Sequence, residues 1–314
     1  MKNDLFTIGS ITIHGYGLMI GIGIIAAYYM AEYRANKRGM DVDMILSIAI
    51  CGVVCGILGA KILYYVTILD EIVENPKKLL DISDGFVVYG GIIGGVLGGY
   101  VLSRIKHISF FQYADLVMPS VALAQGFGRI GCFLAGCCYG RETESPLGIT
   151  FTHSDFAPNG VALIPTQEIS SLLNFVNFFI LINIAKRKKA EGQVGAFYLI
   201  FYSIGRFILE FYRGDLGRGS VGSLSTSQFI AIFTLIAGII LVIVSQMLAN
   251  KGVKAFRVGP GGTAWQAEPE SAEAGEAASA AENKTDDEHP ESDNTSEPEK
   301  EDAPEDAAED SGKE

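Results

Sequence analysis

Long apolar runs separated by short polar segments dominate the first 258 residues of the chain. About 20 consecutive apolar residues allow a helix to cross the hydrocarbon core of a bilayer. The pattern therefore predicts an all-α polytopic membrane protein with seven transmembrane helices, at about residues 15–33, 44–68, 86–105, 112–134, 168–185, 194–212 and 227–248. The opening stretch MKNDLFTIGSITIHG lacks a basic leader and a small-residue cleavage site, so we expect the first span to be retained.

Basic residues mark every second end of these predicted spans. They follow the first, third, fifth and seventh apolar runs, whereas the intervening loops are mixed or acidic. Cytoplasmic loops of membrane proteins carry an excess of Lys and Arg. We therefore predict that the N-terminus lies outside the cell and that the C-terminus is cytoplasmic.

Residues 259–314 differ in composition from the rest. They hold 19 Asp and Glu residues against three Lys, with few large apolar side chains. The net charge of the whole chain is −12, so residues 1–258 are net basic. Such a tail cannot bury enough apolar surface to offset the entropy lost on ordering. We predict a seven-span body at 1–258 and a disordered acidic cytoplasmic tail at 259–314.

Charged side chains interrupt two of the apolar runs. Arg129 lies within AQGFGRIGCF, and Arg206 lies within FYSIGRFILEFYRG. An arginine near the middle of a span costs roughly 2.5–3.5 kcal/mol on insertion scales, so it faces a partner or a wet cavity. Glu210 and Arg213 share one helical face with Arg206. An internal Arg206–Glu210 pair that neutralises itself is therefore one interpretation of the second run.

Arg129 has no acidic neighbour within one helical turn on either side. Its counter-charge must come from elsewhere, and a guanidinium group suits phosphate because its planar fork donates two parallel hydrogen bonds. The glycines beside Arg129 permit a broken helix or a close approach to the backbone, which membranes tolerate only around a cavity. The sequence predicts an intramembrane site for an anionic headgroup, open to the outer leaflet.

Six glycines in YGGIIGGVLGGY form two small-xxx-small ridges. Such ridges let helix backbones approach closely in lipid. We expect a tightly packed central helix here, with Tyr89 held near the outer face at its end.

The chain has five cysteines, too few for a secreted disulfide scaffold. Cys51 and Cys55 lie four residues apart on the second span and are expected to be small packing residues. Cys137 and Cys138 are adjacent and cannot easily bond each other. No Cys-x-x-Cys pair or histidine accompanies them at metal-ligand spacing. We therefore expect no metal and no cofactor, and structural rather than catalytic roles for these two cysteines.

The segments around the arginines resemble those of the prolipoprotein diacylglyceryl transferase family. GRIGCFLAGCCYG, at 128–140, is similar to the family signature G-R-x-G-N-F-x-N-G-E-x-x-G. GRFILEFYR resembles the late family span that bears Arg, Glu and Arg. DGFVVYGGIIGG resembles the segment D-G-G-x-x-x-H-G-G-x-x-G, and PTQ resembles H-P-[ST]-Q. The resemblance runs from residue 13 to residue 228 and leaves the acidic tail outside.

The resemblance implies a multi-pass enzyme of the bacterial inner membrane. Such enzymes transfer a diacylglyceryl group from phosphatidylglycerol to the lipobox cysteine of a prolipoprotein, which forms a thioether and releases glycerol phosphate. The implied partners are phosphatidylglycerol, prolipoprotein signal peptides and the bilayer, and no nucleic acid is expected. The alternatives are a related transferase that acts on another extracytoplasmic thiol, and a non-enzymatic lipid-binding or transport protein.

Residue by residue, the resemblance implies two sets of site residues. The catalytic set is Arg129, Arg206, Glu210 and Tyr89, which stands where the family has a histidine. The substrate-binding set is Arg129, Tyr16, Tyr202, Arg213, Gly140, Gly90 and Gly91. The signature departs from the family at Cys132, Ala135 and Cys137, which replace two asparagines and a glutamate.

The implied chemistry agrees with the predicted anion site. Displacement at a glyceryl carbon builds charge on the departing phosphate, and preorganised guanidinium groups stabilise such charge. The acceptor thiol has a pKa of about 8.5, so a base or a strongly positive site must favour its thiolate. Tyr89 can be that base only if it ionises near neutral pH; alternatively, it orients a headgroup.

Overall fold

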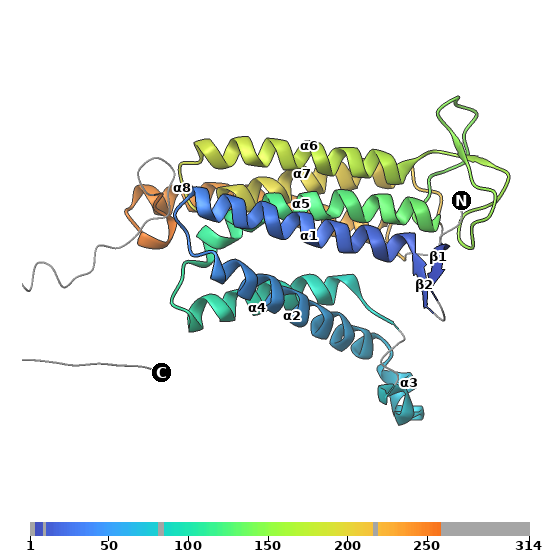
Figure 1. The fold of residues 1–314 in the computed structure, drawn as a ribbon, viewed down its shortest axis with the longest axis horizontal. Coiled ribbons are helices and arrows are strands. Elements are labelled where there is room, and N and C mark those ends of the chain that lie inside the picture. The colour runs from blue at the N-terminus through green and yellow to red at the C-terminus, as the bar shows by residue number, and fades with distance from the viewer. Residues whose placement is uncertain (1–3, 9–10, 81–84, 216–218, 259–314) are drawn as a thin grey trace, which may run out of the picture. The chain divides into compact units, whose positions relative to one another are not determined.

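The computed structural model describes residues 4–8, 11–80, 85–215 and 219–258. Long helices that alternate in direction make up most of this part of the chain (Figure 1). They are α1 (Gly15–Lys37), α2 (Asp43–Thr67), α4 (Val88–Ile105), α5 (Phe110–Ala135), α6 (Thr166–Arg187), α7 (Gln193–Glu210) and α8 (Thr226–Asn250). The predicted tail at 259–314 lies outside the described residues.

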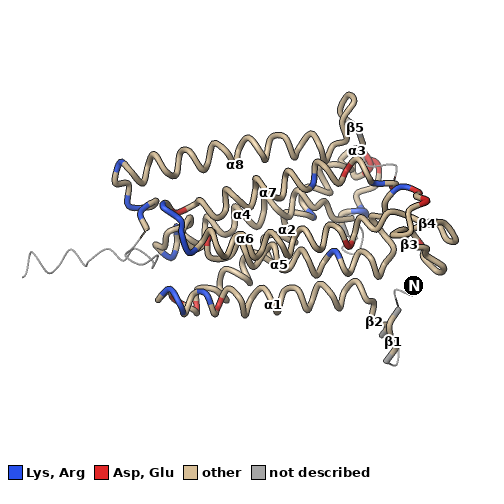
Figure 2. The backbone as a smooth tube through the Cα atoms, turned by 90° about the horizontal axis from the view of Figure 1, so that it is seen from above, with Lys and Arg blue, Asp and Glu red and all other residues tan. Residues whose placement is uncertain are grey.

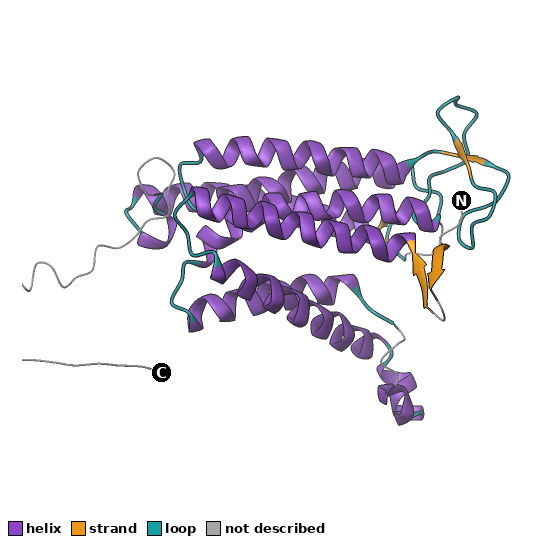
Figure 3. Ribbon diagram, viewed as in Figure 1, coloured by secondary structure: helices purple, strands orange, loops and turns teal. Residues whose placement is uncertain are grey.

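Short hairpins lie at the end of the bundle where α1 begins (Figure 3). The antiparallel pairs are β1 (Asp4–Ile8) with β2 (Ile11–His14), β3 (Ile149–Thr150) with β4 (Ala162–Leu163), and β5 (Ser220–Val221) with β6 (Leu224–Ser225). The short helices are α3 (Leu69–Glu74), η1 (Pro76–Leu80) and η2 (Lys254–Phe256).

Six of the long helices are long and apolar enough to cross a membrane, by length and composition. They coincide with six of the seven spans expected from the sequence. The helix outside this set is α7, whose 18 residues include Gln193, Arg206 and Glu210. The expected span at 194–212 does form a helix, and the count of seven membrane crossings stays a prediction.

Charge is distributed along the described part of the bundle as a membrane protein requires. Lys and Arg gather at the end where α1 and α8 finish (Figure 2). Large apolar side chains such as Ile62, Ile105 and Phe179 are exposed on the outer faces of the helices. An apolar surface of this extent is costly in water and favourable in lipid. The protein is therefore a polytopic membrane protein.

The helix around which the others pack is α5. One buried cluster joins it to α1 and α2, through Ala31, Ala35, Ile45, Tyr113 and Leu116. A second cluster joins it to α6 and α7, through Ala122, Phe178, Leu181, Val194 and Tyr198. The central position that we expected for α4 is wrong, because 11% of α4 is buried, against 33% of α5.

The glycines of α4 pack against α2, as predicted for small-xxx-small ridges. Gly90 lies against the Gly59 carbonyl, and a Cβ added at Gly94 would collide with the Cys55 carbonyl. The second ridge is looser, since a Cβ at Gly95 would meet only the Gly52 carbonyl, at 3.6 Å. Close packing is therefore confirmed, and the ridge that contains Gly90 and Gly94 makes the contact.

A proline inside α5 ties this helix to α1. Pro119 has no N–H to donate to the carbonyl of Asp115, one turn earlier. Arg34 of α1 supplies donors there instead: Nη2 donates to the Asp115 carbonyl at 3.4 Å, and Nη1 donates to the Leu116 carbonyl. The interrupted helix thus gains a partner from its neighbour.

The side chain of Asp115 ties α5 to the beginning of α7. It is fully buried, and it accepts hydrogen bonds from the backbone N–H groups of Gly192 and Gly195, both at 2.9 Å. Lys188 donates to the same carboxylate at 3.0 Å and also pairs with Glu191. These groups form a buried polar cluster at the end of the bundle opposite the hairpins.

Candidate functional site

A cavity of about 790 Å³ lies along α6 and α7, with Arg129 and Arg206 in its lining. Most other lining side chains are apolar and belong to these two helices. Leu173 and Ile208 line the cavity and are also 42% and 52% exposed, so the cavity reaches the outer, lipid-facing flank of the bundle. A long apolar space that ends at arginines suits an amphiphile with an anionic head.

A second, small cavity of about 10 Å³ adjoins the first, because Arg129 and Arg206 line both. Its other lining residues include Arg213, Cys138 and Gln167. Three guanidinium groups around a space of this size repel one another unless negative charge lies between them. The three groups come from α5 and from α7 with the turn that follows it.

Two of these arginines have carboxylate partners. Arg206 lies 2.8 Å from Glu210 and donates a hydrogen bond to Ser227 at 2.8 Å. Arg213 pairs with Asp215 through both carboxylate oxygens, at 2.9 and 2.7 Å. The internal Arg206–Glu210 pair expected as one interpretation of the sequence is thus present, and both side chains are held in fixed orientations.

The charge of Arg213 is secured by its partner. Burial lowers the pKa of the guanidinium group, but the hydrogen bonds and charge of Asp215 outweigh burial and raise the pKa above its ordinary value. Arg213 therefore stays charged at the edge of the small cavity.

Arg129 differs from the other two. Among the described residues, no carboxylate forms an ion pair with Arg129. Its neighbours in the cavity linings include Tyr202 in the large cavity and Cys138 in the small one. The described residues therefore do not supply the counter-charge that we expected Arg129 to find beyond its own helical turn.

The segment after α5 pairs with the segment after α7. Arg141 donates its N–H to the Tyr212 carbonyl at 2.9 Å, and Gly214 donates to the Tyr139 carbonyl at 3.1 Å. Gly140 lies between these bonds, and a side chain there would collide with the Ile164 carbonyl. Gly140 thus allows close contact with the segment before α6, and its backbone also bridges to that of Arg213.

Two tyrosines expected at the site lie near Arg129. Tyr202 lines the large cavity and stacks on Tyr198, with ring centroids 5.8 Å apart. Tyr16 begins α1 and packs beside Gly131 of α5. It is close enough to Arg129 for the two side chains to interact electrostatically.

Three other residues that we expected at the site line neither cavity. Tyr89, Gly90 and Gly91 lie at the beginning of α4 and are absent from the lining of both cavities. Gly90 and Gly91 face α2, where they allow close helix packing. Their assignment to the site stays a prediction.

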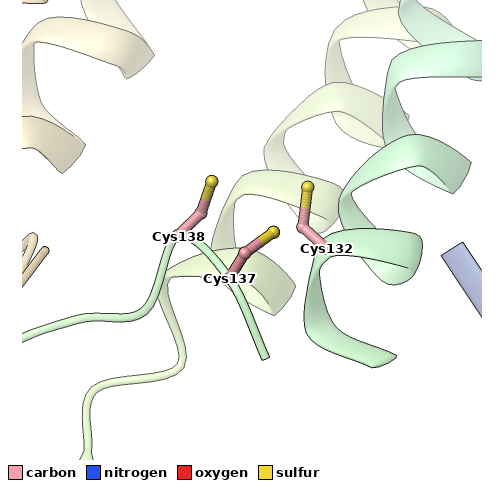
Figure 4. A group of neighbouring side chains, drawn as sticks. All are labelled: Cys132, Cys137 and Cys138. Carbon is pink, nitrogen blue, oxygen red and sulfur yellow. The ribbon is translucent and has the colours of Figure 1, made fainter. Parts of the chain in front are cut away.

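Three cysteines converge beside the arginines, which our sequence analysis missed. The Sγ atoms of Cys132, Cys137 and Cys138 all lie within 4.8 Å of one another (Figure 4). Gly136 ends α5 in the left-handed conformation, and Cys137 donates its N–H to the Cys132 carbonyl at 3.1 Å. A glycine at this position of a helix end is the signal that could have revealed the reversal.

Two side chains of α6 hold the cysteine loop. Gln167 donates to the Cys137 carbonyl, and Thr166 donates to the Cys138 carbonyl, each at 2.9 Å. Cys138 itself has a φ of 65°, in the left-handed region. A non-glycine residue pays roughly 1–2 kcal/mol for this conformation, so the surrounding bonds must hold it there.

Comparison with known families and proteins gives one consistent result. The family model for prolipoprotein diacylglyceryl transferase matches residues 3–244. The phosphatidylglycerol–prolipoprotein diacylglyceryl transferase of Clostridium tetani is 49% identical over 239 residues, which are 76% of this chain and 96% of that protein. Transferase 2 of Clostridium perfringens is 46% identical over 252 residues, with coverages of 80% and 98%. The Clostridioides difficile transferase is 36% identical over 241 residues, with coverages of 76% and 94%.

Proposed function

Because this chain belongs to the prolipoprotein diacylglyceryl transferase family, we propose that it transfers a diacylglyceryl group from phosphatidylglycerol to a prolipoprotein. The acceptor is the thiol of the lipobox cysteine, the product is a thioether, and glycerol phosphate leaves. The observation that carries this proposal is Arg129, which has no carboxylate partner among the described residues and lines both a lipid-sized apolar cavity and the three-arginine space.

The two parts of the donor lipid are assigned to the apolar walls of the large cavity and to its arginine-lined end. The acyl chains lie along α6 and α7, where the walls are apolar and reach the lipid-facing flank. The headgroup phosphate contacts Arg129 and Arg206 at the end of the large cavity that both line, with Arg213 beside them across the small cavity. A planar guanidinium group binds phosphate oxygens through two parallel hydrogen bonds, so the arginines fix the phosphate in orientation as well as in place.

The arginines also supply the catalysis of the leaving step. As the bond from the glyceryl carbon to oxygen breaks, negative charge grows on the phosphate. Donors that already point at that charge need no reorganisation during the reaction. Glu210 and Ser227 hold Arg206 in position, and Asp215 holds Arg213. No carboxylate of the described residues pairs with Arg129, so its full charge acts on the phosphate.

Tyr16 and Tyr202 complete the proposed donor site. Tyr202 lies in the wall of the large cavity beside Arg129, where its ring contacts the lipid and its hydroxyl reaches the headgroup region. Tyr16 approaches Arg129 from the side of α1. Gly140 acts indirectly, since it packs against the segment before α6 while its backbone bridges to that of Arg213.

The proposed orientation puts this site on the extracytoplasmic side of the inner membrane. Its support is the alternation of helix direction together with the Lys and Arg residues at the end where α1 and α8 finish (Figure 2). The site lies at the opposite end, near the hairpins. With α7 counted as a span, the body at 1–258 crosses the membrane seven times.

A defined assay tests the proposed function. The full-length protein in mixed micelles with phosphatidylglycerol is given a lipobox peptide, and mass spectrometry follows the peptide. We expect a diacylglyceryl adduct on the cysteine together with release of glycerol phosphate, and no adduct on a peptide with serine in its place. Binding of phosphatidylglycerol without any transfer would show a lipid-binding protein. Transfer to small thiols in preference to lipobox peptides would show a transferase with another acceptor.

A further inference from the structure

The geometry of the three cysteines matches a metal-binding set. A zinc–sulfur bond is about 2.3 Å long, so three sulfurs in tetrahedral coordination lie roughly 3.8 Å apart. The Sγ atoms of Cys132, Cys137 and Cys138 already lie within 4.8 Å of one another and face a shared space (Figure 4). Small side-chain movements are therefore enough to close this set around one ion.

The surrounding chain holds this arrangement in advance. Cys132 lies on the last turn of α5, and Gly136 turns the backbone so that the next two cysteines return toward it. Gln167 and Thr166 fix the carbonyl groups of the returning segment. The side chain of Cys138, whose backbone is left-handed, points to the same space (Figure 4). Ligands that are held in position by hydrogen bonds from the surrounding residues are typical of a preorganised metal site.

The number of ligands indicates which kind of site this is. No fourth Cys, His, Asp or Glu among the described residues joins the three thiols. Structural zinc sites are closed by four protein ligands, whereas catalytic sites have three and leave one position for water or substrate. All three cysteines are only partly buried, so an outside ligand can reach them.

The charge around the cluster also suits zinc. Three thiolates and one divalent cation leave a single negative charge. Arg129 and Arg213 line the small cavity together with Cys138, so two guanidinium groups lie beside that charge. Three thiolates around a monovalent copper ion would leave a larger net negative charge than around zinc. Such a copper ion would also need no fourth ligand.

We propose that Cys132, Cys137 and Cys138 bind one zinc ion, and that its open position takes the acceptor thiol of the prolipoprotein. This proposal rests on the proposed function, and the zinc ion supplies the activation of the acceptor thiol that the transfer requires. Cys138 also lines the small cavity with the three arginines, so the bound thiol and the departing phosphate are neighbours. Metal coordination deprotonates a thiol outright, so no separate base is needed at Tyr89.

The reaction balances without any change of oxidation state. The acceptor thiol loses its proton to water when it displaces the water on zinc. The electron pair of the bound sulfur forms the carbon–sulfur bond while the carbon–oxygen bond of the glyceryl group breaks. That second electron pair goes to the phosphate oxygen, and glycerol phosphate leaves. The neutral thioether is a weaker ligand than a thiolate, so it dissociates and water returns to zinc.

Metal analysis of the full-length protein tests the site itself. The protein carries no metal-binding tag and is purified in detergent with reductant and without oxygen. We expect about one zinc ion per chain by mass spectrometry. Cys137→Ser is expected to lose most of it. The matched control is Cys51→Ser, since Cys51 and Cys55 form a pair of thiols 3.8 Å apart with no third cysteine. Absence of zinc, or equal loss in both variants, would overturn the proposal.

Cobalt in place of zinc tests the open position. Each thiolate bound to cobalt adds charge-transfer absorption, so a lipobox peptide should increase it, and the serine peptide should not. Equal spectra with both peptides would overturn the acceptor role. This readout does not depend on turnover.

Chelation of the unaltered protein tests the catalytic role without relying on any variant to fold. Removal of zinc should lower the transfer rate about 100-fold, the scale of assisted proton removal, and zinc but not magnesium should restore it. Full transfer by a protein shown to be free of zinc would overturn the inference and leave the proposed function standing. Zinc and thiol binding without transfer under any condition would instead count against the proposed function.

Discussion

At the scale of single residues, the three arginines differ in how their charge is balanced. Arg206 and Arg213 each hold a carboxylate, which fixes their orientation but also uses part of their charge. Arg129 has no such partner among the described residues. An incoming phosphate therefore gains most of its binding energy from Arg129. A substitution that removes the bidentate geometry of Arg129 should accordingly have the strongest effect on activity.

We predict that Arg129→Lys lowers kcat by about 10²–10³-fold, because a point charge cannot replace the bidentate contact with the departing phosphate. The measurement is diacylglyceryl transfer to a lipobox peptide under saturating phosphatidylglycerol. Arg104→Lys serves as the control, since Arg104 is exposed at the end of α4. Near-normal turnover of a well-inserted Arg129→Lys variant would contradict the role that we assign to this residue.

These arginines could be selected from the sequence because a charge in an apolar run is conspicuous whatever its partner. The cysteine cluster could not be found by ligand spacing, because its sulfurs meet only after Gly136 reverses the chain. Tyr89 is the opposite case, and its role at the site stays a prediction. Its motif suggested the site, but the packing of α4 against α2 leaves it outside the lining of both cavities.

At the scale of helices, apolar runs predicted where the long helices lie but not which helices pack together. The glycines of α4 indicated close packing without naming α2 as the partner. The central position of α5 was hidden because Asp115, Pro119 and Gln125 make it look less apolar than α2. Those polar groups are satisfied by neighbours: Arg34 bonds the carbonyls near Pro119, and Tyr198 donates to Gln125 at 2.9 Å.

The two glycine ridges of α4 offer a matched pair of substitutions. Gly94→Ala places a Cβ against the Cys55 carbonyl and should destabilise the protein by about 1–3 kcal/mol, the usual range for overpacking. Gly95→Ala meets only ordinary contact, at 3.6 Å, and should be close to neutral. Thermal unfolding in detergent measures both. Equal losses would show that helix propensity or lipid contact, rather than the α2 interface, decides the outcome.

The polar cluster around Asp115 predicts a larger effect. Asp115→Ala leaves Lys188 with one carboxylate fewer and leaves the N–H groups at the beginning of α7 without their acceptor. Breaking a buried pair of this kind costs about 3–5 kcal/mol. Denaturant unfolding should show this loss, while Asp70→Ala, at an exposed position of α3, should stay within about 0.5 kcal/mol. An unaffected Asp115→Ala variant would mean that water replaces the carboxylate.

At the scale of the whole molecule, the relatives divide the chain into a shared and an added part. The Clostridium tetani and Clostridium perfringens proteins are covered over 96% and 98% of their lengths by 76% and 80% of this chain. The family match ends at residue 244, before the acidic residues of 259–314 begin. The shared part therefore spans nearly the full length of these two relatives.

We predict that truncation after Arg257 leaves membrane insertion and transfer intact, within about twofold. The reason is that every residue lining the two cavities precedes this position. Insertion is measured by protease protection, which also tests the orientation: the C-terminal segment should resist protease added outside intact cells. A correctly inserted but inactive truncation would assign a role in turnover to residues 258–314.

The apolar cavity that reaches the flank of α6 and α7 has a kinetic consequence. A donor that enters from the side never passes through water, so its encounter rate depends on diffusion within a surface. The relevant concentration is then the mole fraction of phosphatidylglycerol among neighbouring lipids. Adding inert detergent at constant total donor should slow the enzyme, whereas diluting micelles of fixed composition should not. A KM of this protein for its lipid donor is therefore meaningful only when it is expressed as a surface density.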